Sequence, residues 1–136
     1  MIDAPLLRCS PLFEGMSDED LQRWATACEE SAFLNGANIA KEGEFAYRFY
    51  VVLDGEVEVL HGFDRIALLG PGDFFGEMGV MAAGRRNARV TAHGRCTLAS
   101  VLAWDFQELT GEFPEVAARI DERVQQRMAA LPPEDD

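Results

Sequence analysis

Two side chains of opposite charge, Glu77 and Arg86, lie nine residues apart within a glycine-rich stretch of this 136-residue chain. Glycines such as Gly76 and Gly79 allow successive backbone N–H groups to approach an anion closely. The guanidinium of Arg86 is permanently charged, and its planar fork fits phosphate oxygens. Because phosphate would repel Glu77, we expect that carboxylate to accept a hydrogen bond from a ribose hydroxyl. These residue types together predict a ligand that carries both phosphate and sugar.

Two other interpretations of the same residues stay open. A Gly-x-x-Gly sequence beside an arginine, taken alone, is more typical of a hairpin than of a phosphate site. Glu77 and Arg86 are also compatible with a structural ion pair in a protein that binds no ligand. The secondary structure predicted around Glu77 and Arg86 therefore helps to choose between these interpretations.

The chain before this stretch predicts one helix that begins after Ser17. Serine is a favourable N-cap, and acidic residues fill the turn that follows it. Apolar residues then recur at the spacing of a single helix face, namely Leu21, Trp24, Ala25 and Cys28. Phe13 precedes the cap, and we expect it to pack back on that face.

Residues 31–102 carry the pattern of many short strands. Glycines recur at short intervals between segments rich in Val, Leu, Phe and Tyr. Asp54-Gly55 favours a positive φ and lies between residues 50–53 and 56–59, which predicts a hairpin. Further strands are predicted at residues 65–69, 89–91 and 97–102. Short strands at such spacing indicate an antiparallel sandwich or barrel.

Helical spacing returns after Ala103. Residues 104–109 predict a short helix that Gly111 breaks, and Pro114 suits the first turn of a second helix. The second helix has one apolar stripe, formed by Phe113, Ala117, Ile120, Val124 and Met128.

The expected fold is mainly β with flanking helices. An antiparallel, jelly-roll-like β-roll at about 31–102 follows one N-terminal helix. Two C-terminal helices at about 104–130 and an acidic tail at 131–136 come after it. We expect residues 1–136 to form a single domain.

Composition argues against several other classes of protein. Only 12 basic residues face 24 acidic ones, so we expect no nucleic-acid partner. The cysteines form no C-x-x-C pair and the two histidines lie far apart, which indicates no metal site. No segment predicts a signal peptide or a membrane span, and we expect a cytoplasmic protein with no membrane insertion. We find no catalytic constellation and expect no enzyme activity.

Two longer motifs narrow the interpretation. The first reads Ile39-Ala40, Gly43-Glu44-Phe45-Ala46, Phe49-Tyr50-Val51-Val52 and Gly55. The second reads Phe75-Gly76-Glu77-Met78-Gly79-Val80, followed by Arg86-Asn87-Ala88-Arg89-Val90. Both resemble the signatures of the cyclic-nucleotide-binding domains found in catabolite activator proteins, kinase regulatory subunits and ion channels. The likeness covers about residues 12–127, and the second motif resembles the family's phosphate-binding cassette.

The resemblance implies a role for each matched position. Glu77 would accept the ribose 2′-hydroxyl, and Arg86 would hold the cyclic phosphate. The remaining residues of the implied ligand-binding set are Gly76, Met78, Gly79 and Asn87, which lie where backbone N–H groups complete the phosphate site. Val57 or Val59 would pack on the base. The last helix would be a mobile lid, with Arg127 placed where some family members carry a base-capping arginine.

Four residues depart from the family pattern, and one of them, Ala40, is smaller than the aliphatic residue expected there. Asn87 stands where Ala, Ser or Thr is usual, Arg85 replaces a frequent Pro, and Arg89 replaces a frequent Thr. A hydroxyl after the phosphate-binding arginine often accompanies use of cGMP in this family. Its absence favours cAMP as the ligand.

We therefore expect a regulatory binding module whose partner is a cyclic nucleotide, cAMP rather than cGMP, with no cofactor and no metal. A homodimer and a fusion to an effector domain in a longer protein both stay open. The alternative is a protein-interaction domain with the same fold and no ligand. A metal-dependent β-roll enzyme is a third class, which the lack of a histidine cluster disfavours.

Overall fold

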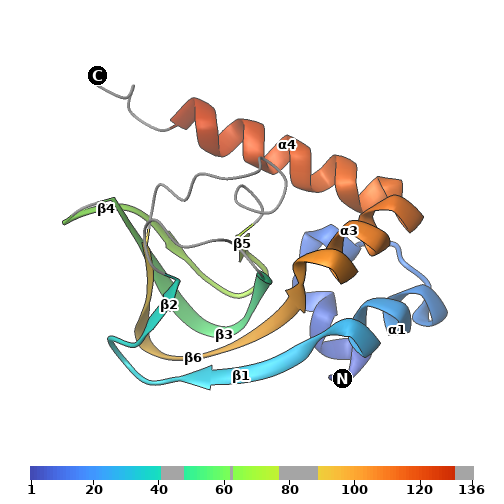
Figure 1. Ribbon diagram of the computed structural model, residues 1–136, viewed down its shortest axis with the longest axis horizontal. Coiled ribbons are helices and arrows are strands. Elements are labelled where there is room, and N and C mark those ends of the chain that lie inside the picture. Colours follow the sequence, from blue (N-terminus) through green and yellow to red (C-terminus); the bar gives the residue numbers. More distant parts are fainter. Residues whose placement is uncertain (41–47, 62, 77–88, 131–136) are drawn as a thin grey trace.

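The computed structural model describes residues 1–40, 48–61, 63–76 and 89–130 (Figure 1). At the N-terminus lie the 3-10 helices η1 (Ala4–Cys9) and η2 (Pro11–Phe13) and helix α1 (Asp18–Ala27). The strands are β1 (Glu29–Phe33), β2 (Asn38–Ala40), β3 (Arg48–His61), β4 (Asp64–Leu69), β5 (Phe74–Phe75) and β6 (Arg89–Leu102). Helices α3 (Ala103–Glu112) and α4 (Pro114–Ala130) follow. The predicted class, mainly β with flanking helices, is confirmed.

Strands β3 and β6 form the spine of the sheet. They pair antiparallel from Arg48 opposite Leu102 to Leu60 opposite Arg89. Strands β1 and β2 add to β6, and β4 and β5 add to β3, all of them antiparallel. Figure 1 shows the long strands curving, with α1 and α3 gathered at one end of the sheet and α4 extending back from that end past β5.

The predicted hairpin at Asp54-Gly55 is wrong. Strand β3 continues through these residues for 14 positions, and both of its halves pair with β6 rather than with each other. The register of that pairing shifts on either side of Asp54, which marks a bulge. Gly55 has a φ of +79°, so its positive φ serves a bulge in a continuous strand and not a turn.

The strands predicted separately at residues 89–91 and 97–102 are likewise one element. Strand β6 runs unbroken from Arg89 to Leu102. Gly94 lies within it at a φ of +80°, and its N–H donates to Oδ1 of Asn35, 2.8 Å away. The glycine that we took for a break between strands therefore joins the two halves of one curved strand.

Helix α1 forms as its sequence predicts. The Ser17 hydroxyl accepts a hydrogen bond from the backbone N–H of Asp20 at 3.1 Å, which is the expected cap. Leu21, Trp24 and Ala25 are buried. The ring of Phe13 packs edge-on against Trp24, with ring centroids 5.2 Å apart, as expected.

The C-terminal helices differ from the prediction in two details. Gly111 lies within α3 rather than breaking it, and Phe113 is the C-cap that separates the two helices. Pro114 begins α4 as expected. In α4 the fully buried residues are Val116, which we did not predict, and Ile120, and Phe113 is buried just before the helix. Ala117 and Val124 of the predicted stripe are only partly buried, and the side chain of Met128 lies outside the described residues.

The buried side chains form two clusters on either side of β5. The helical core joins Trp24, Phe49, Phe106 and Ile120 with the side chains around them. The β-roll core joins Val52, Val57, Leu98 and their neighbours. Phe74 belongs to the first cluster and Phe75 to the second, because successive strand residues face opposite sides.

Candidate functional site

The turn before β5 is held firmly against β3. The N–H of Val52 donates to the carbonyl of Asp73, and the N–H of Gly72 donates to the carbonyl of Val52, both at 2.8 Å. A carboxylate oxygen of Asp73 accepts from the N–H of Gly70 at 3.0 Å. Strand β5 then pairs Phe74 with Val51. These bonds fix the position of β5, which directly precedes Gly76 of the predicted phosphate-binding cassette.

Gly76, which directly follows β5, is a predicted ligand-binding residue that the structure describes. Its φ is +94°, a conformation that side chains with a Cβ rarely adopt. A Cβ on this residue would also lie only 2.6 Å from the carbonyl oxygen of Arg48. The structure therefore requires glycine here for a backbone reason that is independent of any ligand.

Five predicted ligand-binding residues lie outside the described residues, namely Glu77, Met78, Gly79, Arg86 and Asn87. The described chain resumes at Arg89, opposite Leu60, and Val90 is buried opposite Val59. The roles assigned to those five residues stay predictions.

The predicted base contacts come from β3, in the β-roll core. Val57 is fully buried, and Val59, two residues further along the same face, is only partly buried. Phe75 joins the same cluster, where its ring stacks on that of Tyr50 at a centroid distance of 4.7 Å. Of the two valines, Val59 is therefore the one that retains exposed surface for a ligand.

Arg127 of α4 lies against β5. Its guanidinium carbon is 4.6 Å from the centroid of the Phe74 ring, within the range of a cation–π interaction. Phe74 is two residues before Gly76, so the structure brings Arg127 beside the strand that enters the cassette. Sequence reasoning missed Phe74 as a partner of Arg127, and the Phe74-Phe75 pair before Gly76 was the one available signal.

A second anchor of α4 also escaped the sequence interpretation. Nη1 of Arg119 donates to the backbone carbonyl of Leu12 at 2.8 Å, which ties α4 to η2. No local pattern in the sequence indicates this contact, since the two residues lie 107 positions apart.

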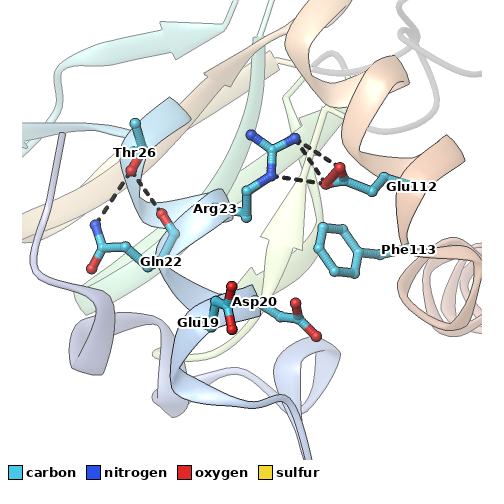
Figure 2. Close-up of a pocket in the computed structure, with 7 residues that line it drawn as sticks. All are labelled: Glu19, Asp20, Gln22, Arg23, Thr26, Glu112 and Phe113. Carbon is cyan, nitrogen blue, oxygen red and sulfur yellow. Dashed lines mark hydrogen bonds and ion pairs between the residues drawn. The ribbon is translucent and has the colours of Figure 1, made fainter.

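A surface pocket lies elsewhere, between α1 and α3 (Figure 2). Arg23 reaches across it and bonds both carboxylate oxygens of Glu112, at 3.0 and 2.9 Å. Glu19, Asp20 and Phe113 are also among its lining residues. None of the predicted site residues lines this pocket, so it is separate from the candidate site.

The described residues contain no group of three or more His, Cys, Asp or Glu side chains arranged to hold a metal ion. Over the same part of the chain, no helix has the length and apolar character needed to cross a membrane.

A sequence model described as "Cyclic nucleotide-binding domain" matches residues 30–112. The chain belongs to this family.

Its relatives include channels, receptors and kinase regulators. A cyclic nucleotide-gated potassium channel of Rhizobium etli is 32% identical over 129 residues, which is 95% of this chain and 36% of the channel. The cyclic AMP receptor protein of Thermus thermophilus is 29% identical over 127 residues, covering 90% of this chain and 59% of the receptor. This cyclic nucleotide-binding domain therefore spans only part of each relative.

A solved structure supports the same assignment. The regulatory domain of Toxoplasma gondii PKA with cAMP matches this domain with a TM-score of 0.81 and 26% sequence identity. The match covers 90% of this chain and 48% of that one. The arrangement of helices around the curved sheet is thus shared with a regulatory domain.

Proposed function

We propose that this domain binds cAMP and acts as a regulatory module rather than as an enzyme. The observation that carries the proposal is the family match across residues 30–112, which includes both Glu77 and Arg86. The Thermus thermophilus relative is a cyclic AMP receptor protein, and the structure of the Toxoplasma gondii regulatory domain is a co-crystal structure with cAMP.

The proposed mechanism divides recognition between two elements. Arg86 and backbone N–H groups of the cassette, including those of Gly79 and Asn87, hold the cyclic phosphate, and Glu77 accepts the ribose 2′-hydroxyl. Val59 packs on the base from β3, and α4 closes over it. A ligand can move α4 only through contacts that differ between its two positions. In the relatives such a domain is one part of a longer chain.

Isothermal titration calorimetry with cAMP tests the proposal, with cGMP as the comparison ligand. We expect tighter binding of cAMP. A charge-assisted bidentate contact contributes about 1.5–3 kcal/mol, so Arg86→Ala should weaken cAMP binding by about tenfold or more.

Arg85→Ala is the matched control, because it removes the same side chain one position away. It should change the affinity far less than Arg86→Ala. A larger effect at Arg85 would show that the cassette motif is aligned with this sequence one residue out of register. Absence of binding to either nucleotide by the wild-type protein would favour the alternative, an interaction domain without a ligand.

A further inference from the structure

The ring of Phe74 lies between the helices and the sheet. Phe74 is 4% exposed and packs against Phe49, whose ring centroid is 5.5 Å away. The guanidinium of Arg127 lies over the ring at 4.6 Å from its centroid. A cation held this close to a largely buried ring is attracted by the negative face of the ring. Phe74 is thus a contact between β5 and the C-terminal half of α4.

Strand β5 directly precedes Gly76, so its two aromatic side chains respond to movement of the backbone there. Phe74 and Phe75 lie in the helical core and the β-roll core respectively, and both directly precede Gly76. Packed cores tolerate little displacement of a large side chain. A shift of the backbone at Gly76 would therefore be felt by an aromatic ring in each core.

Helix α4 has two halves that are anchored differently. In the first half, Val116 and Ile120 are fully buried, and Arg119 bonds to the Leu12 carbonyl. Within residues 121–127, only Val124 and Arg127 are partly buried, and the other side chains are exposed. The first half therefore lies in the helical core, whereas the second half packs against that core through the partly buried Val124 and meets β5 through Arg127.

We propose that Phe74 and Arg127 form a latch that couples β5 to the C-terminal half of α4. Phe74 is a positioning residue: it places the arginine, and with it residues 121–130 of α4, beside the strand that enters the cassette. The attraction depends on the cation lying over the ring face, so a small displacement of β5 weakens it. The idea that a ligand causes this displacement rests on the proposed function, whereas the latch itself does not.

The latch can be tested without any nucleotide by hydrogen exchange of the amides in residues 121–130. Phe74→Leu keeps an apolar side chain but removes the π-face, and Arg127→Met keeps the length but removes the charge. Each should speed exchange in this segment by about three- to tenfold, the range expected for losing one partly buried cation–π contact. The double variant should exchange no faster than the faster single variant, because both remove the same contact. Arg127→Lys should retain most of the protection.

Two controls use the same substitutions at exposed positions. Phe63→Leu changes a ring that is 97% exposed, and Arg123→Met changes an exposed arginine one turn earlier on α4. Neither should alter exchange in residues 121–130 to the same extent. Additive effects of Phe74→Leu and Arg127→Met would overturn the proposal, as would equal effects of Arg127→Met and Arg123→Met. If Phe74→Leu fails to fold, the comparison of Met and Lys at position 127 with Met at position 123 still decides the matter.

A second measurement adds saturating cAMP. In the wild-type protein we expect exchange in residues 121–130 to change on binding, and in Phe74→Leu this change should be much smaller. Failure of the wild-type protein to bind cAMP would contradict the proposed function and the ligand response together, and the nucleotide-free result would stand. Normal binding of cAMP with an unaltered response in Phe74→Leu would contradict the latch alone.

Discussion

Gly55 combines two demands that only glycine meets. Its φ is +79°, and a Cβ there would lie 2.4 Å from the Arg95 carbonyl oxygen and 2.9 Å from Cα and Cβ of Cys96. The first demand is conformational and the second is steric, and the obstructing atoms belong mostly to backbone. We expect Gly55→Ala to lower the free energy of unfolding by about 3 kcal/mol, measured by urea denaturation.

Gly94 provides the matched control for that substitution. It has nearly the same φ, +80°, but a Cβ there would meet nothing within 4 Å. Gly94→Ala should therefore cost only the left-handed conformation, about 1–2 kcal/mol. Equal losses in the free energy of unfolding for the two variants would show that the bulge accommodates a methyl group without added steric strain.

Glu77 is the residue that should distinguish ribose from deoxyribose. If its carboxylate accepts from the 2′-hydroxyl, 2′-deoxy-cAMP should bind more weakly than cAMP to the wild-type domain. Glu77→Gln keeps an acceptor, whereas Glu77→Ala removes it, so only the alanine variant should lose most of the preference. Calorimetry with both ligands measures the ratio of affinities. An alanine variant with an unchanged ratio would assign sugar recognition to another group.

At the scale of elements, the cost in stability of truncating an apolar side chain should differ greatly along α4. Ile120 is fully buried among the helices, and Val124, one turn later, is only partly buried. Ile120→Ala should lower the free energy of unfolding by about 2–5 kcal/mol, because it leaves a cavity in the helical core. Val124→Ala should cost about 1 kcal/mol or less, since less apolar surface leaves contact there. Urea denaturation measures both.

This gradient bears on where a lid motion would begin. Gly111, which we expected to break the helix, lies inside α3, and Val116 and Ile120 in the first two turns of α4 are fully buried. A lid that moves from Pro114 onwards would have to extract Val116 and Ile120 from the core. Similar losses at Ile120 and Val124 would contradict this division of the helix.

At the scale of the whole molecule, ionisation of buried thiols should lower the free energy of unfolding at alkaline pH. Burial raises the pKa of Cys28 from 9.0 to about 12, although the nearby N-terminal charge lowers it slightly. Between those values the unfolded chain releases this proton and the folded chain keeps it. Stability from this group is therefore complete below pH 9 and is lost as the pH rises towards 12, by on the order of 1 kcal/mol per pH unit.

Urea denaturation at a series of pH values from 8 to 11 checks this expectation. Burial and, to a smaller extent, the charge of Asp54 raise the pKa of Cys96 as well, so the total slope contains more than one thiol. Cys28→Ala isolates one contribution, and its loss of stability with pH should be shallower than that of the wild-type protein. Parallel curves for the two proteins would mean that Cys28 ionises equally in the folded and unfolded chains.

The sequence by itself determined those features of this protein whose causes are local. Ser17 caps α1 through a hydrogen bond to a residue three positions away, and Pro114 begins α4 because its φ suits a first helical turn. The pairing of Phe13 with Trp24 follows from helical spacing and a short connection. Family membership was also predictable, because the two motifs occur in order in the sequence itself. The roles of Glu77 and Arg86 stay predictions, since both lie outside the described residues.

Only the tertiary structure decided the features that depend on distant partners. A positive φ at Gly55 suits a turn and a bulge equally, and the outcome depended on β6 pairing with both halves of β3. Phe74 and Phe75 are indistinguishable in sequence, yet the alternation of β5 sends them into different cores. Arg127 meets Phe74 because α4 docks through Val116 and Ile120 at the far end of the helix. Residue patterns encode local preference, but such contacts form only when separate elements pack together.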